Sequence, residues 1–168
     1  PLTNRKFDII IHLANIANDP AVDLNPTLSW EVNVLAGYSL AEFALKRGCR
    51  QLIFASSGSV YGIKNEPKVT EDLELVPISA YNKTKMIAER VFMSYAQMLK
   101  IHCIRPATVC GWSPRMRLDV AVNLLTFQGL SKKEITVFGG DQTRPNIHID
   151  DMVAVYDHFI SNPDIPSG

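Results

Sequence analysis

Short runs rich in apolar and β-branched residues alternate along this chain with longer stretches of helical periodicity, which limits the folds it can adopt. The runs at residues 7–14, 51–57 and 101–106 are typical of strands buried on both faces of a parallel sheet. Residues 135–138, closed by two glycines, are a shorter fourth candidate strand. Strands that alternate with helices predict right-handed βαβ crossovers and an α/β fold with a doubly wound parallel sheet.

The helical stretches have recognisable ends. Residues from about 28 to 47 carry apolar side chains at helical spacing, and Gly48 follows where a C-terminal cap is expected. Ser79 is a candidate N-cap for a long helix that reaches about residue 99, because apolar residues recur in it every four positions. Two more helices are expected over residues 119–130 and 150–160.

Composition narrows the class of protein. The 168 residues include 17 basic and 17 acidic side chains, so the formal net charge is zero, which argues against nucleic acid or an anionic membrane as partner. No apolar run approaches the roughly 20 residues that a membrane span needs. Three scattered cysteines suit a reducing compartment, so a cytoplasmic location is expected. The four histidines lack metal-ligand spacing, and no metal site is expected.

Ligands of parallel α/β sheets bind at the carboxyl ends of strands, so a site is expected near residues 13–17, 56–62 and 106–111. Residues 56–62 gather small hydroxyl side chains, although a polar turn alone would explain them. Tyr81 and Lys85 lie four residues apart and therefore share a helix face. An ammonium near a phenol favours the phenolate, which can take a proton from a substrate hydroxyl. A solvated surface pair is the alternative.

In chain order, a series of segments resembles the extended short-chain dehydrogenase/reductases, specifically the NAD-dependent nucleotide-sugar epimerase/dehydratase group. The segments are residues 12–14, residues 30–34 with Asn33, residues 56–62, residues 81–85, residues 104–106 with Gly111, residues 138–144 and residues 147–151. The resemblance extends over nearly the whole chain. It implies a Rossmann-like sheet of which this chain holds the later strands, with the start of a small substrate-binding region.

This resemblance implies roles for individual residues. Tyr81 would be the base on a sugar hydroxyl, Lys85 would lower its pKa and bind the nicotinamide ribose, and Ser57 would hold the reacting oxygen. Arg144 would pair with the nucleotide diphosphate, a geometry that guanidinium suits. The implied cofactor-binding residues are Leu13, Ala14, Asn15, Ala55, Ser56, Tyr81, Lys85 and Pro106, and the implied substrate-binding residues are Ser57, Thr108, Asn123 and Arg144. Tyr61 is expected to support its loop by packing.

The implied function is NAD-dependent epimerisation at C4 of a nucleotide sugar through a keto-sugar intermediate, with NADP as an alternative cofactor. Dehydratases of the group place an Asp-Glu pair directly after the active-site hydroxyl residue, where this chain has Gly58 and Ser59, so 4,6-dehydration is disfavoured. A reductase or dehydratase of a nucleotide sugar or other carbonyl compound remains an alternative. A catalytically silent cofactor-binding fragment is another. Arg115 and Arg117 are expected either near the diphosphate or on a solvated surface.

The resemblance begins at the family's fourth strand, and the nine glycines show no Gly-rich pyrophosphate loop. The chain is therefore expected to be a fragment without the N-terminal Gly-rich half. Residues 1–110 would form the C-terminal part of the cofactor-binding domain, with the catalytic Ser, Tyr and Lys. Residues 111–168 would form a partial substrate-binding region with returning strand and helix elements. The resemblance also implies a homodimer through a four-helix bundle that includes the helix of Tyr81 and Lys85.

Overall fold

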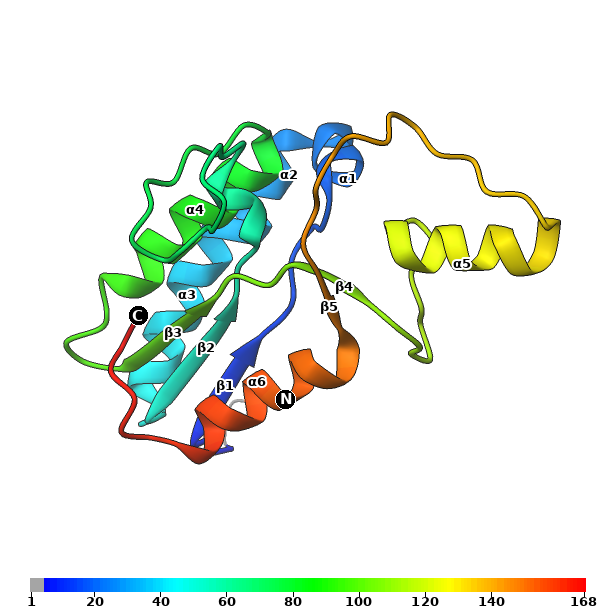
Figure 1. Ribbon diagram of the computed structural model, residues 1–168. Coiled ribbons are helices and arrows are strands. Elements are labelled where there is room, and N and C mark those ends of the chain that lie inside the picture. The colour runs from blue at the N-terminus through cyan, green and yellow to red at the C-terminus, as the bar shows by residue number, and fades with distance from the viewer. Residues whose placement is uncertain (1–4) are drawn as a thin grey trace. The chain divides into compact units, whose positions relative to one another are not determined.

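Three of the apolar runs form a parallel sheet in the computed structural model, which describes residues 5–168 (Figure 1). Its strands are β1 (Ile9–His12), β2 (Gln51–Ala55) and β3 (Lys100–Ile104), in the order β1-β2-β3. Both pairings are parallel, with Ile10 opposite Leu52 and Leu52 opposite Ile101. The predicted α/β fold is confirmed, and each strand is shorter than the apolar run that predicted it.

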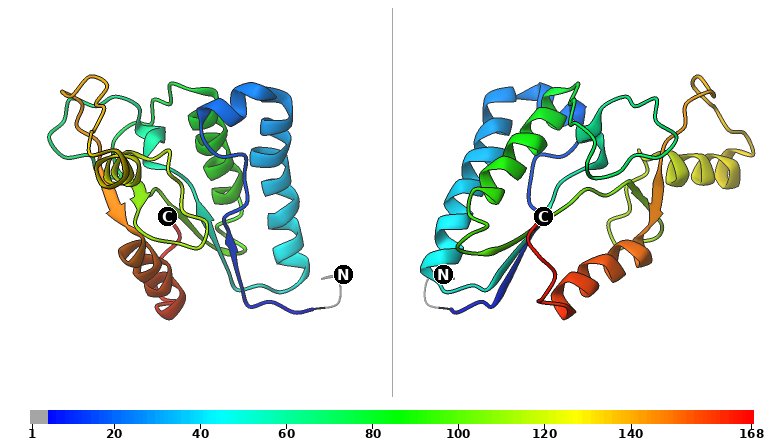
Figure 2. Two further views of the ribbon diagram at one scale, coloured as in Figure 1. Left: turned by 90° about the vertical axis from the view of Figure 1, so that its right-hand side faces the viewer. Right: turned by 60° about the vertical axis from the view of Figure 1, so that its left-hand side comes forward.

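The crossovers between these strands are mainly helical. Between β1 and β2 lie α1 (Asp19–Leu24), α2 (Pro26–Trp30), the π-helical turn η2 (Glu31–Leu35) and α3 (Ala36–Lys46), and between β2 and β3 lie the 3-10 turn η3 (Gly58–Tyr61) and α4 (Ala80–Met93). Because the strands follow one another in sequence order, right-handed crossovers place α3 and α4 on the same face of the sheet, where Figures 1 and 2 show them.

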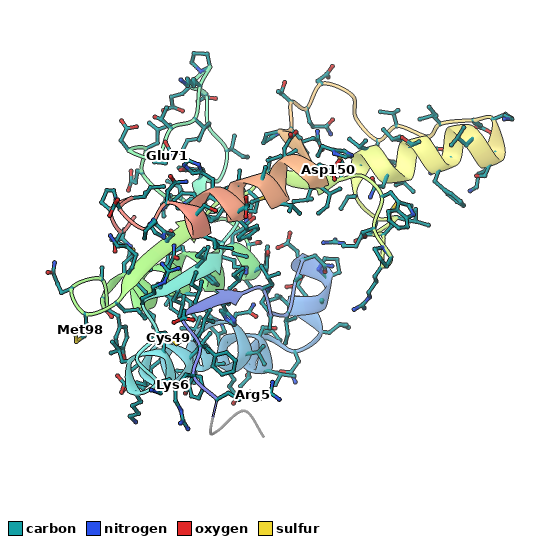
Figure 3. All side chains as sticks on the ribbon, turned by 90° about the horizontal axis from the view of Figure 1, so that it is seen from below. Arg5, Lys6, Cys49, Glu71, Met98 and Asp150 are labelled. Atoms are coloured by element: carbon teal, nitrogen blue, oxygen red, sulfur yellow. The ribbon has the colours of Figure 1, made fainter. Side chains whose placement is uncertain are left out.

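The core fills the space between that sheet face and these two helices. Phe54 of β2 and Phe92 of α4 are its largest aromatic pair, with ring centroids 4.8 Å apart. The buried cluster consists of Ala41, Ala44, Cys49, Leu52, Phe54, Ala88, Phe92, Tyr95, Leu99 and Ile101. Cys49 and Met98 lie before β2 and β3, at the amino ends of those strands (Figure 3). The carboxyl ends of the strands lie at the opposite edge of the sheet, where polar residues such as Ser56 and Arg105 follow β2 and β3.

Two predicted helix ends are confirmed and one is wrong. Gly48 adopts a φ of +69° directly after the C-cap of α3, and the bonds Gly48 N–Leu45 O (3.1 Å) and Cys49 N–Ala44 O (3.0 Å) form a Schellman motif. Ser79 is the N-cap of α4, where its side chain accepts from the amide of Asn82. The helix ends at Met93 rather than near residue 99, because the chain continues as turns that still bury Tyr95 and Leu99.

The described chain divides into two compact units, one with residues up to Arg105 together with Asn162–Gly168, and one with Pro106–Ser161. In the first unit the C-terminal segment lies along β3, where Gly168 donates to the carbonyl of Ile101 and its own carbonyl accepts from Cys103. The predicted division near residue 110 into cofactor-binding and substrate-binding parts stays a prediction.

The second unit contains the parallel strands β4 (Thr108–Cys110) and β5 (Asn146–His148), with α5 (Ala121–Lys132) and α6 (Ile149–Ser161). Both helices were predicted. The strand predicted at residues 135–138 is wrong: Ile135, Val137 and Phe138 are exposed in a loop, where no strand pairs with them. In the described part of the chain, no helix is both long and apolar enough to cross a membrane.

Candidate active site

Tyr81 and Lys85 lie one turn apart on α4, as the four-residue spacing predicts. The Lys85 ammonium is 5.8 Å from the Tyr81 ring centroid and 4.8 Å from that of Phe54, and it donates to the Ala55 carbonyl at 2.7 Å. The residue is only 1% exposed. Burial lowers the pKa of Lys85 to about 8, although the nearby charge of Glu89 opposes this shift. A cation held beside a phenol stabilises the phenolate and so favours its use as a base.

Ser57 reaches the same helix turn through a chain of polar groups. It is the N-cap of η3, and its Oγ lies 2.8 Å from the Oγ of Ser59. Ser59 in turn donates to Oδ1 of Asn82 at 2.6 Å. These contacts link Ser57 to the first turn of α4, which also carries Tyr81, and Lys85 reaches the same strand end through the carbonyl of Ala55.

The loop after β1 supplies polar groups at the neighbouring strand end. Leu13 and Ala14 are exposed, and the side-chain amide of Asn15 donates to the carbonyl of Leu13 at 2.9 Å. The other side-chain atom of Asn15, Oδ1, is buried and accepts no hydrogen bond within the described residues, and Nε2 of His12 is also unpaired there. Such atoms are rare in folded proteins, and they suit a ligand that donates to this loop.

Asn33 connects this loop to α4. Its side chain accepts from the amide of Ile16 at 2.7 Å and donates to the carbonyl of Ile16 at 3.0 Å. It also donates to Thr84 Oγ1 at 3.1 Å, and that hydroxyl donates to the carbonyl of Tyr81 at 2.7 Å. Asn33 lies in the π-helical turn η2, a distortion often found at functional sites. The family resemblance singles out Asn33, but its link to the Tyr81 carbonyl through Thr84 is visible only in the structure.

Glu89, which is buried, and Arg105, which is half-buried, form an ion pair that sequence reasoning missed. The carboxylate accepts from Nε of Arg105 at 3.0 Å and from Nη2 at 2.7 Å, and it also accepts from the hydroxyl of Ser56. Nη1 of Arg105 donates to the Tyr61 hydroxyl at 2.9 Å. The bonds to Glu89 hold the pKa of Arg105 above its usual range. A signal was present, since Glu89 continues the four-residue spacing of Tyr81 and Lys85.

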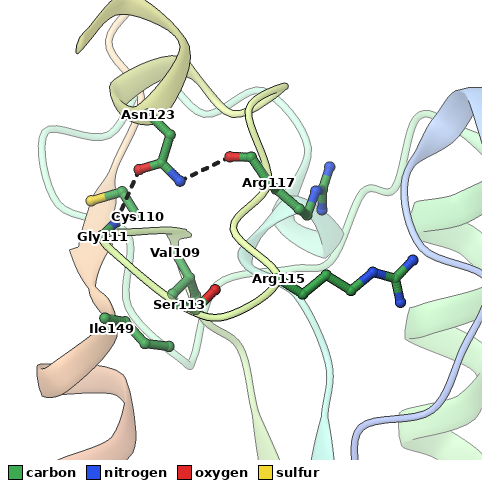
Figure 4. A pocket seen from close by; sticks show the side chains of 8 residues that line it. All are labelled: Val109, Cys110, Gly111, Ser113, Arg115, Arg117, Asn123 and Ile149. Atoms are coloured by element: carbon green, nitrogen blue, oxygen red, sulfur yellow. Dashed lines mark hydrogen bonds between the residues drawn. The ribbon is translucent and has the colours of Figure 1, made fainter. Parts of the chain in front are cut away.

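The remaining predicted site residues belong to the second unit. Pro106 begins it, and Thr108 pairs with Asn146 between β4 and β5. Asn123 accepts from the amide of Gly111 at 3.0 Å and donates to the carbonyl of Arg117 at 2.9 Å (Figure 4). Asn123, Gly111 and Arg117 border a cavity of about 170 Å³ that Ser113 and Arg115 also line.

Both arginine-bearing loops of this unit are exposed. Arg117 forms an exposed ion pair with Asp119 at 2.6 Å, and Arg115 is an exposed residue of the same loop (Figure 4). Arg144 lies in the loop before β5, which Gln142 shapes by accepting from the amide of Gly140 and donating to the carbonyl of Phe138. Within residues 5–168, no three His, Cys, Asp or Glu side chains cluster as a metal site requires.

Comparison with known proteins shows the family of the chain. The model of the NAD dependent epimerase/dehydratase family matches residues 2–168. The chain belongs to this family. It is 34% identical over 148 residues to the uncharacterized UDP-glucose epimerase YtcB of Bacillus subtilis (strain 168), covering 87% of this chain and 46% of that protein. It is 32% identical over 161 residues to the UDP-glucose 4-epimerase of Mycolicibacterium smegmatis, covering 92% and 51%.

Solved structures give the same result. MoeE5 in complex with UDP-glucuronic acid and NAD superposes with a TM-score of 0.83 at 28% identity, covering 95% of this chain and 54% of that one. The UDP-glucuronic acid 4-epimerase of Bacillus cereus, in complex with UDP-glucuronic acid and NAD, has a TM-score of 0.79 at 31% identity, covering 91% and 49%. The chain thus spans about half the length of the family members it matches, and its fold is the Rossmann-like fold of these enzymes.

Proposed function

We propose that this chain carries the catalytic residues of an NAD-dependent epimerase that inverts C4 of a UDP-sugar. The observation that carries the proposal is the buried Lys85 ammonium beside Tyr81, at the strand end where Ser57 also lies. The relatives named as UDP-glucose 4-epimerases, and the similar structures holding UDP-sugars and NAD, support the substrate class and the cofactor. NADP remains the alternative cofactor.

The described residues fit a nicotinamide cofactor. The unpaired Oδ1 of Asn15 lies in the loop that would line it, and Lys85 offers a cation beside Tyr81. The Ala55 carbonyl and the Ser56 hydroxyl are already bonded to Lys85 and Glu89, so we assign these two residues to the wall of the site. Leu13, Ala14 and Pro106 complete the proposed cofactor-binding set. A nicotinamide cofactor held by these residues would supply the acceptor and donor of the hydride at C4 of the sugar.

In this mechanism the protein moves a proton and orients the sugar. The Tyr81 phenolate removes the proton of the 4-hydroxyl as the C4 hydride leaves, so that a carbonyl forms at C4. Lys85 stabilises the phenolate, and Ser57 holds the reacting oxygen. The keto sugar then rotates in the site, so that its opposite face receives the hydride at C4. Tyr81 returns the proton to O4 in the same step.

The second unit would hold the nucleotide part of the substrate. Arg144 has an exposed guanidinium suited to a diphosphate, and Thr108 stands on β4 as a candidate sugar contact. The side-chain amide of Asn123 donates one hydrogen to the carbonyl of Arg117, and its second hydrogen can be donated to a ligand. We assign substrate binding to these three residues together with Ser57.

Turnover of the purified full-length protein tests the function. UDP-glucose or UDP-glucuronic acid is incubated with catalytic NAD, and the 4-epimer is measured by proton NMR. We expect epimer without net change in cofactor, and Tyr81→Phe should lose at least a hundredfold in turnover while binding NAD as before. Stoichiometric use of NAD(P)H would instead indicate a reductase. NAD binding without any turnover would indicate a silent cofactor-binding module, and undiminished turnover in Tyr81→Phe would refute the mechanism.

The surface and the cysteines support the remaining assignments. Leu35 at the end of η2 and Tyr38 in α3 are exposed. We propose that this face forms the interface of a homodimer. Sedimentation equilibrium would show a mass twice that of the chain. All three cysteines are free thiols, which supports a cytoplasmic location. The zero net charge supports a small-molecule partner over nucleic acid.

A further inference from the structure

The segment that carries Ser57 has both of its ends attached to one side chain. Ser56, at its start, donates its hydroxyl proton to the Glu89 carboxylate. Tyr61, at its end, accepts from Nη1 of Arg105 at 2.9 Å, and Arg105 is itself bound to Glu89 through Nε at 3.0 Å and Nη2 at 2.7 Å. A single carboxylate on α4 therefore holds the chain on either side of Ser57.

These attachments are made largely out of contact with water. The Glu89 side chain is 4% exposed, and hydrogen bonds to an ionised group are stronger than those between neutral groups. The Arg105 guanidinium also lies over the Tyr61 ring, 5.1 Å from its centroid. The backbone adds a further bond, since the amide of Ser56 donates to the carbonyl of Ile104 at 2.7 Å. Both ends of the segment are thus fixed by buried contacts.

Glu89 lies on the helix that carries the proposed base. Tyr81, Lys85 and Glu89 follow one another at intervals of four residues on α4, so they share one side of this helix. A helix is a stiff spacer, because backbone hydrogen bonds connect each turn to the next. The attachment to Glu89 therefore fixes the position of the Ser57 segment relative to Tyr81.

We propose that Glu89 is a positioning residue, which acts through Ser56 and Arg105 to keep Ser57 at a constant distance from Tyr81. The inference rests on the proposed function. Replacing a buried ion pair by apolar side chains of similar volume is often neutral or stabilising, so stability alone does not explain this pair. A reaction in which two groups act on one sugar oxygen does explain it, because a small displacement of either group slows such a reaction strongly.

The double variant Glu89→Met/Arg105→Met tests the proposal in the full-length protein. It removes the bonds of Glu89 without leaving an uncompensated buried charge, so the protein should still fold. At a temperature where wild type and variant are both folded, kcat should fall by about tenfold or more, and by more than KM changes. In a Ser57→Ala background, the same two substitutions should lower kcat by less than about twofold. An equal loss in both backgrounds, or a wild-type kcat in the double variant, would overturn the proposal.

Tyr61→Phe is a milder variant with a matched control. It retains the ring beside Arg105 and removes only the hydroxyl that holds the end of the segment, so kcat should fall about twofold to fivefold. Tyr95→Phe removes a hydroxyl that donates to Glu42 at 2.9 Å elsewhere in the same unit, and it should leave kcat unchanged. A kcat in Tyr61→Phe as high as that in Tyr95→Phe would contradict the proposal.

Amide hydrogen exchange of the free full-length protein gives a readout that needs no turnover. In Glu89→Met/Arg105→Met, the amide of Ser56 should exchange about tenfold faster or more, whereas the amide of Ile53 in the middle of β2 should keep its rate. An unchanged rate at Ser56, or an equal acceleration at Ile53, would refute the positioning role. If the wild-type protein shows no turnover, the proposed function fails, while these rates still decide whether Glu89 holds the segment of Ser57.

Discussion

Burial of Lys85 destabilises the folded state, because its ammonium is removed almost completely from water. The carbonyl of Ala55 and the faces of two aromatic rings replace only part of its hydration. The lowering of its pKa from 10.5 to about 8 corresponds to roughly 3 kcal/mol against the folded state at pH 7. Groups that destabilise a fold in this way are typical of functional sites.

Replacing Lys85 by methionine should therefore separate stability from activity. We expect Lys85→Met to raise the unfolding free energy at pH 7 by about 1–2 kcal/mol, after allowance for the lost bond to Ala55, and to abolish epimerisation. Urea unfolding followed by circular dichroism measures the first effect. The gain should shrink between pH 8 and 10.5, where folded Lys85 is neutral while the unfolded chain still holds the proton. A less stable variant would contradict this explanation.

At the scale of elements, the Glu89–Arg105 pair connects four parts of the first unit. Glu89 lies on α4, Arg105 follows β3, and their partners Ser56 and Tyr61 belong to the end of β2 and to η3. The side chain of Glu89 is 4% exposed and that of Arg105 is 22% exposed. The pair therefore holds the strand ends in position against the helix that carries Tyr81 and Lys85.

Breaking the Glu89–Arg105 pair should lower the unfolding free energy. Glu89→Gln leaves a half-buried guanidinium without a counter-charge, so we expect a loss of about 2–4 kcal/mol in unfolding free energy. Asp119→Asn is the matched control, because it breaks an ion pair whose side chains are 50% and 60% exposed and should cost less than about 1 kcal/mol. Equal losses in urea unfolding would show that burial does not set the strength of these pairs.

Element boundaries show where periodicity misleads. The four-residue apolar spacing after Ser79 continues past the helix, because the turns that follow α4 still bury Tyr95 and Leu99. Spacing therefore reports burial, whereas the backbone hydrogen bonds decide where the helix ends. The apolar run at residues 135–138 failed as a strand prediction for the complementary reason, since a strand needs a neighbour to pair with and none lies beside this loop.

At the scale of the whole molecule, two histidines with lowered pKa values make the unfolding free energy depend on pH. His102 accepts from Gln51 and faces the carbonyls of Ile165 and Pro166, so it links β2, β3 and the C-terminal segment. Burial lowers its pKa below 6.5, and the charge of Lys100 adds to this against the opposing carbonyl bonds. Burial, with a smaller effect from Lys85, also lowers the pKa of His12. Both side chains are consequently neutral in the folded state at neutral pH.

Stability should fall as the pH drops below about 6.5, because the unfolded chain then binds protons that the folded chain excludes. Between pH 7.5 and 5.5 we expect a loss of up to about 1 kcal/mol per histidine in unfolding free energy. His102→Gln should flatten this dependence. An unchanged slope in His102→Gln would show that another group is responsible.

The sequence by itself determined the alternation of strands and helices, the cap residues Gly48 and Ser79, and the shared face of Tyr81 and Lys85. These follow from local periodicity and from backbone conformations that few residues adopt. Only the tertiary structure decided that Lys85 is buried, that Glu89 pairs with Arg105, and that Asn82 holds the hydroxyl chain of Ser57. Each of these contacts joins residues distant in sequence or depends on exclusion of water, and no local pattern records either.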